Sequence, residues 1–110
     1  LSVSVFLLRI SQLEIRDENT TSGHVLSVKG ALFYASVAHL TDIFHSHLGE
    51  NLTVDLQYTT HIDQSAVDFF NRESENMATK GAKLTLLVND KQRSFLEKLG
   101  ANSTIELDSI

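Results

Sequence analysis

The chain has 110 residues, a formal net charge of −5 at pH 7 and no cysteine. This length suits one domain with a hydrophobic core. The absence of cysteine excludes disulfides, thiolate metal sites and thiol nucleophiles. The negative charge argues against nucleic-acid binding, which needs clustered Lys and Arg to neutralise phosphates.

The first segment, Leu1 to Ile10, is apolar (LSVSVFLLRI) but too short to cross a bilayer, which needs about 20 residues. Val3 and Val5 alternate with serines, which predicts an edge strand. The alternative is the last turns of a membrane helix. We prefer the strand, and we expect residues 1–12 to be an N-terminal strand or a linker from a membrane region and residues 13–110 to form the domain.

Two strands, Leu13 to Asp17 and His24 to Lys29, are predicted on either side of a polar turn, which indicates an antiparallel hairpin at the sheet edge. Gly30 is expected to end the second strand. A helix is then predicted to begin near Ser36. Its apolar face has helical spacing and consists of Val37, Leu40, Phe44 and Leu48, with Gly49 as the C-cap.

The central stretch, Leu52 to Phe70, predicts a strand, a polar bend and a helix. Leu52 to Tyr58 alternates apolar and polar residues, as a packed strand does. Asp63 and Ser65 are both N-cap candidates, and Asp68 follows Ser65 at close to capping-box spacing. The apolar positions of this helix are Ala66, Phe69, Phe70 and Met77, and Lys80-Gly81 is a typical helix end.

The apolar run Leu84 to Val88 predicts a parallel strand covered on both faces. A third helix, capped by Asn89 or Asp90, and a last strand, Thr104 to Leu107, complete the order. The whole predicts a single α/β domain with a mixed, mostly parallel sheet, an antiparallel N-terminal edge and three to four helices. One contiguous core is expected from Phe44, Val54, Leu56, Phe69, Phe70, Leu84 and Leu86.

Two segments carry a resemblance to a known family. Val54-Asp55-Leu56 followed by Ile62-Asp63-Gln64-Ser65-Ala66-Val67 is similar to the strand, loop and helix of STAS domains. That family includes anti-sigma-factor antagonists and the cytoplasmic domains of sulfate-type (SulP) anion transporters. Residues 30–36 (GALFYAS) resemble a segment of the transporter branch, with Ala31 where that branch usually has Pro. The resemblance extends from about His24 to Leu107.

The resemblance implies a non-catalytic regulatory and interaction domain of a membrane anion transporter, located at the cytoplasmic face of the inner membrane. Its partner would be the transmembrane part of that transporter or another basic protein surface. The alternative is a stand-alone switch, like an anti-sigma-factor antagonist, that acts through phosphorylation of Ser65. Nucleotide binding is a weaker idea, because the acidic residues near the loop would repel phosphates.

The resemblance also selects the candidate site. Ser65 would be the phosphorylated residue, although its hydroxyl has a simpler role as a helix cap. The interaction loop would comprise Thr60, His61, Asp63, Gln64, Ser65 and Asp68. No paired acids, no nucleophile with a base and no phosphate-binding glycine loop occur, so the sequence indicates no catalytic residue and no cofactor.

The five histidines do not predict a metal site. His45 and His47 are two residues apart on a predicted helix, so their side chains point about 200° apart. His24, His39 and His61 have no His or carboxylate partner at ligand spacing, and surface positions are expected for them.

Between Asp42 and Asp68 the chain has five acidic residues and no Lys or Arg. We expect this acidic strip to face basic loops of a partner and to turn away from anionic lipid headgroups.

Overall fold

The computed structural model describes residues 4–10, 13–20, 23–32, 34–47 and 49–109. Its elements, in chain order, are β1 (Ser4–Ile10), β2 (Leu13–Thr20), β3 (Gly23–Leu32), α1 (Tyr34–Ser46), β4 (Leu52–Asp55), β5 (Thr59–Ile62), α2 (Gln64–Thr79), β6 (Leu84–Val88), α3 (Asp90–Lys98) and β7 (Ile105–Ser109).

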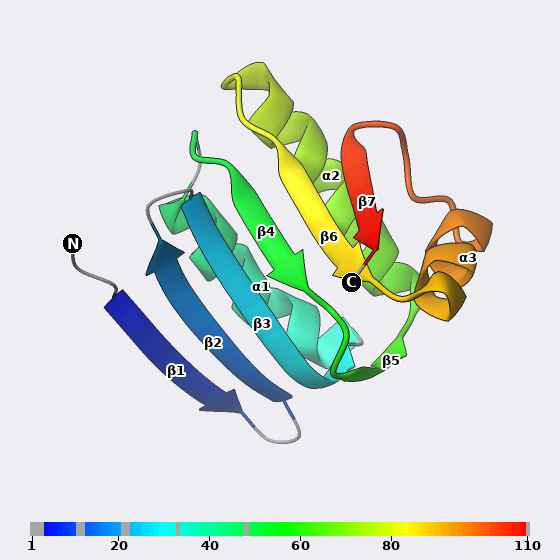
Figure 1. Ribbon diagram of the computed structural model, residues 1–110, viewed down its shortest axis with the longest axis horizontal. Helices are drawn as coiled ribbons and strands as arrows, with labels where there is room; N and C mark the ends of the chain where they lie inside the picture. The colour runs from blue at the N-terminus through cyan, green and yellow to red at the C-terminus, as the bar shows by residue number, and fades with distance from the viewer. Residues whose placement is uncertain (1–3, 11–12, 21–22, 33, 48, 110) are drawn as a thin grey trace.

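All of these strands belong to one mixed sheet (Figure 1). Its order is β1-β2-β3-β4-β6-β7, and β5 pairs with the end of β3. The β1–β2 and β2–β3 pairs are antiparallel, while the other pairs are parallel. The predicted α/β fold with an antiparallel N-terminal edge is confirmed, with three helices in the described residues. Residues 4–10 form a strand, and the division of the chain at residue 12 stays a prediction.

β3 does not end at Gly30, contrary to the sequence-based prediction. The strand continues to Leu32, and Gly30 adopts a φ of 114°, which favours glycine. The pairing register shifts between Gly30 and Ala31, so the first half of β3 pairs with β4 and its end pairs with β5. The glycine therefore produces an irregularity within the strand rather than its end. Phe33, in the segment resembling transporters, lies outside the described residues.

The central strand is shorter than predicted because Asp55 forms a local turn. Its Oδ1 accepts a hydrogen bond from the Gln57 backbone N–H (3.0 Å), and its Oδ2 accepts one from Gln57 Nε2 (2.8 Å). Such Asx turns redirect the backbone. β4 consequently ends at Asp55, and Tyr58, predicted to be on the buried face, is exposed. Thr59–Ile62, predicted to be part of a bend, forms β5 instead.

α1 and α2 pack against each other and lie behind the sheet in Figure 1. All seven residues of the predicted core are buried in one cluster. Phe44, Phe69 and Phe70 join α1 to α2, with ring centroids 4.9 Å apart for Phe44–Phe69 and 5.6 Å apart for Phe69–Phe70.

In the central strands β3, β4 and β6, only one face is fully buried. In β6, Leu84, Leu86 and Val88 are buried, whereas Thr85 and Leu87 are half-buried, so the prediction that both faces of this strand are covered is wrong. In the described part of the chain, no helix has the length and apolar character required to cross a membrane.

Candidate functional site

The loop between β5 and α2 is joined to β3 by a backbone hydrogen bond. The Asp63 backbone N–H donates to the carbonyl of Leu32 (3.2 Å), the last residue of β3. Asp63 is the N-cap of α2: its backbone is extended, and its side-chain Oδ1 accepts from the Ala66 N–H (3.1 Å). The capping role considered for Asp63 is therefore confirmed.

Ser65 is not the cap, which corrects one of the two roles predicted for it. It lies in the first turn of α2, and its hydroxyl donates to Asp63 Oδ1 at 2.5 Å. The same carboxylate oxygen thus accepts from Ser65 and from the helix backbone. Asp68 does not complete a capping box with Ser65; its Oδ1 accepts from Gln64 Nε2 (3.0 Å). A half-buried serine hydroxyl at a helix N-terminus is oriented by one carboxylate.

The other residues of the predicted loop lie on β5 and on α2. Thr60 and His61 are exposed on β5. Gln64 Nε2 also donates to the carbonyl of Leu99 (2.8 Å), which follows α3. The structure therefore connects the start of α2 to the end of α3, a contact that the sequence did not indicate.

A groove of about 540 Å³ lies between β5 and α3. Thr60 and His61 contribute to one side, and Lys91, Phe95 and Lys98 contribute to the other. Phe95 and Leu96 are neighbouring apolar residues of α3. Leu96 is buried, but Phe95 is 43% exposed. An exposed ring beside two lysines offers a partner both an apolar contact and positive charge.

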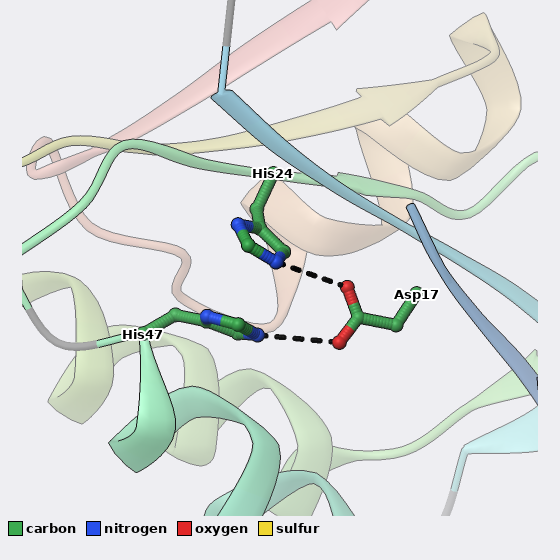
Figure 2. A group of neighbouring side chains, drawn as sticks. All are labelled: Asp17, His24 and His47. Atoms are coloured by element: carbon green, nitrogen blue, oxygen red, sulfur yellow. Dashed lines mark hydrogen bonds and ion pairs between the residues drawn. The ribbon is translucent and has the colours of Figure 1, made fainter. Parts of the chain in front are cut away.

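Two histidines contradict the expectation of surface positions without partners. His24 is 9% exposed, and its ring centroid lies 3.6 Å from that of His47. Both rings direct Nε2 toward the carboxylate of Asp17, as Figure 2 shows: the distances are 3.4 Å from His24 to Oδ1 and 3.2 Å from His47 to Oδ2. The predicted angle of about 200° between His45 and His47 assumed that both lie on one helix, but α1 ends at Ser46, and His47 follows it.

The five acidic residues of the predicted strip do not form one surface. Glu50 lies beside His47, near the amino end of β3. The Asp63 backbone N–H instead donates a hydrogen bond to Leu32, at the carboxyl end of β3. Asp55 is engaged in the turn with Gln57. The prediction of a basic partner is therefore restricted to Asp63 and Asp68, which lie together at the start of α2.

The elements from β2 to β7 lie within the residues that one family model matches. The family model for the STAS domain matches residues 12–109. The chain belongs to the STAS-domain family. No curated protein sequence gives a significant match to this STAS domain.

Several solved structures share the fold. The first is an anti-sigma factor antagonist from Mycobacterium paratuberculosis, with a TM-score of 0.70 and 13% identity over 97% of this chain and 86% of that one. The anti-sigma factor antagonist SpoIIAA in its unphosphorylated form has a TM-score of 0.63 and 10% identity, over 94% and 86%. SiaC from Pseudomonas aeruginosa has a TM-score of 0.61 and 14% identity, over 96% and 98%.

SiaC is also the activator in a complex with the diguanylate cyclase SiaD from Pseudomonas aeruginosa. At these identities the similarity shows a shared fold. The comparisons therefore establish a STAS domain and do not extend to membership of the transporter branch.

Proposed function

We propose that this STAS domain is a non-catalytic switch that binds a partner protein and changes its affinity when Ser65 is phosphorylated. This was the alternative at the sequence level. The observation that carries it is the position of Ser65, whose hydroxyl lies at the N-terminus of α2 and donates to Asp63 at 2.5 Å. The similarity in fold to anti-sigma factor antagonists supports the proposal.

Phosphorylation would change both the bonding and the charge at this loop. A phosphorylated Oγ has no proton to donate, so the bond from Ser65 to Asp63 is lost. The phosphate adds a charge of about −1.5 to −2 close to the Asp63 carboxylate, which it repels. The helix dipole at the start of α2 favours the same phosphate. These opposing effects make the loop sensitive to the modification.

The groove between β5 and α3 is the surface where we expect a partner to detect this change. Residues 59–62 line the groove and lead directly into Asp63. A partner that inserts an apolar side chain against Phe95 would therefore lie close to the modified loop. Basic groups on that partner would face Asp63 and Asp68, and a phosphate at Ser65 would alter this attraction.

The transporter function, with its transmembrane partner and its location at the cytoplasmic face of the inner membrane, stays a prediction. It rests on the resemblance of residues 30–36 to the transporter branch. A switch and a transporter domain differ in one respect that can be measured, which is whether Ser65 controls binding.

The test has two parts. The chain is first purified from its own cells, and its intact mass and phosphopeptides are measured with and without phosphatase; we expect modification at Ser65 and its loss in Ser65→Ala. A photo-crosslinking residue is then placed at Phe95 in Ser65→Ala and Ser65→Asp backgrounds. We expect the partner to crosslink to one variant at least tenfold more than to the other.

Ser103 supplies the matched control, because it is an exposed serine in the turn before β7, away from the groove. Ser103→Ala and Ser103→Asp should crosslink equally. Equal crosslinking of the partner to Ser65→Ala and Ser65→Asp contradicts the proposed switch. The absence of phosphate on Ser65 in cells contradicts it as well.

A further inference from the structure

The two histidines and the aspartate in Figure 2 come from three separate parts of the fold. Asp17 is on β2, His24 is at the start of β3, and His47 directly follows α1. β3 and β4 begin at one end of the sheet, while β5 leads into α2 at the other (Figure 1). The cluster is thus remote from Ser65 and is not used by the proposed switch.

The ligand atoms of this cluster have the separations of a metal site. One nitrogen from each histidine and one oxygen from Asp17 lie within 4.8 Å of one another. The two measured Nε2–oxygen distances are 3.4 Å and 3.2 Å. Ligand atoms placed about 2.0–2.1 Å from Zn²⁺ in a tetrahedron are about 3.3–3.4 Å apart. Each histidine nitrogen therefore lies at about this spacing from one oxygen of Asp17, Oδ1 for His24 and Oδ2 for His47.

Glu50 prepares His47 to act as a ligand through Nε2. Its Oε1 lies 3.1 Å from His47 Nδ1, within hydrogen-bond distance, and 3.9 Å from His24 Nδ1. When the Nδ1–H of neutral His47 donates a hydrogen bond to Glu50, the lone pair that a metal needs is on Nε2. A carboxylate behind a ligating histidine is a regular feature of metal sites, where it sets the tautomer and ring orientation.

Asp17 and Glu50 also make the site favourable for a cation. Asp17 Oδ1 is buried and accepts no hydrogen bond from the described residues, although His24 Nε2 is 3.4 Å away. Within those residues, neither carboxylate forms an ion pair with Lys or Arg. A buried carboxylate oxygen without a donor is costly, and a bound cation removes that cost.

We propose that Asp17, His24 and His47 bind a divalent first-row transition ion of the Zn²⁺ type, with Glu50 as the positioning residue. Two imidazoles and one carboxylate favour such an ion over Mg²⁺ and Ca²⁺, which prefer ligand sets made of oxygen. The ion would connect the β2–β3 hairpin to the end of α1 and stabilise this end of the domain.

The test uses the whole chain without an affinity tag, after treatment with a chelator. Titration with Zn²⁺ by calorimetry should give one site per chain with a Kd of 10 μM or tighter. Co²⁺ should produce visible absorption bands, and Mg²⁺ and Ca²⁺ should give no binding. Asp17→Asn and His47→Gln should weaken Zn²⁺ binding at least 100-fold, and Glu50→Gln should weaken it about 10- to 100-fold.

His39→Gln is the matched control, since His39 is an exposed histidine on α1 outside the cluster. The affinity of this variant for Zn²⁺ should equal that of the parent protein. NMR of the imidazole nitrogens in the unmodified chain provides a measurement that needs no variant. Zn²⁺ should shift the resonances of His24 and His47 and leave those of His39 and His61 unchanged. A Kd above 1 mM, equal binding by Asp17→Asn and the parent, or shifts spread over all histidines overturns the proposal.

Discussion

Asp63 and Ser65 make different contributions to stability, and replacing each by alanine separates them. Asp63→Ala removes the N-cap bond to Ala66, the acceptor for Ser65, and a negative charge at the start of α2. The cap is worth about 1 kcal/mol, the charge about 0.3–1 kcal/mol, and the hydroxyl bond to a carboxylate about 1–2 kcal/mol. We expect Asp63→Ala to lower the free energy of unfolding by about 2–4 kcal/mol.

Ser65→Ala should cost much less, about 0.5–1.5 kcal/mol, because Asp63 still caps the helix and alanine favours helical backbone. The two changes should not be additive. Once Asp63 is absent, Ser65 has lost its acceptor, so a double-mutant cycle should give a coupling energy of about 1 kcal/mol. The cycle also cancels any other interaction of Asp63 that does not involve Ser65.

The assay is urea unfolding followed by far-UV circular dichroism, with equal slopes required for the four proteins of the cycle. Asp68→Ala is the control, because Asp68 is an exposed acid on the same helix with Gln64 as its hydrogen-bond partner; it should change stability by less than about 0.5 kcal/mol. A cost of Ser65→Ala equal to that of Asp63→Ala would refute the assignment of Asp63 as the cap. A coupling energy of zero would refute the hydrogen bond from Ser65 to Asp63.

Two further predictions concern the core and the third helix. Phe70→Ala should lower the free energy of unfolding by about 3–5 kcal/mol, because Phe70 is 1% exposed and the loss of its ring leaves a cavity. The control Phe95→Ala, at a residue that is 43% exposed, should lower it by less than about 1 kcal/mol. Equal losses of stability in the two variants contradict the core assignment. Gln92→Ala should cost about 1–3 kcal/mol, since Gln92 Nε2 donates to the Leu56 carbonyl (2.7 Å) and its Oε1 accepts from Asn89 in a capping box. An unchanged urea midpoint for Gln92→Ala would exclude that role.

The sequence by itself determined the helices and strands in which buried residues recur at a regular spacing. The predicted strand Leu84–Val88 has the bounds of β6, and the apolar residues predicted for α2 are all buried. The seven predicted core residues lie in one cluster. Periodicity predicts these features because a strand or helix buries one face, and that face appears directly in the spacing of apolar side chains.

The choice of helix cap required the tertiary structure. Asp63 and Ser65 have similar local preferences for the N-cap, so propensity did not distinguish them. The deciding interaction is the bond from the Asp63 N–H to Leu32, which fixes where β5 ends and α2 begins. The early end of β4 could be anticipated only in part, because Asp55 can either stay in a strand or form a turn with Gln57.

The histidine cluster was decided by the tertiary structure alone. His24 and His47 are far apart in the chain, and neither has ligand spacing to Asp17. The antiparallel register places Asp17 opposite Leu26 on the neighbouring strand, close to His24, and the return of α1 toward the amino end of β3 brings in His47. Strand register and helix packing are set by the sum of many contacts across the core, and therefore no local pattern of residues records which side chains they bring together.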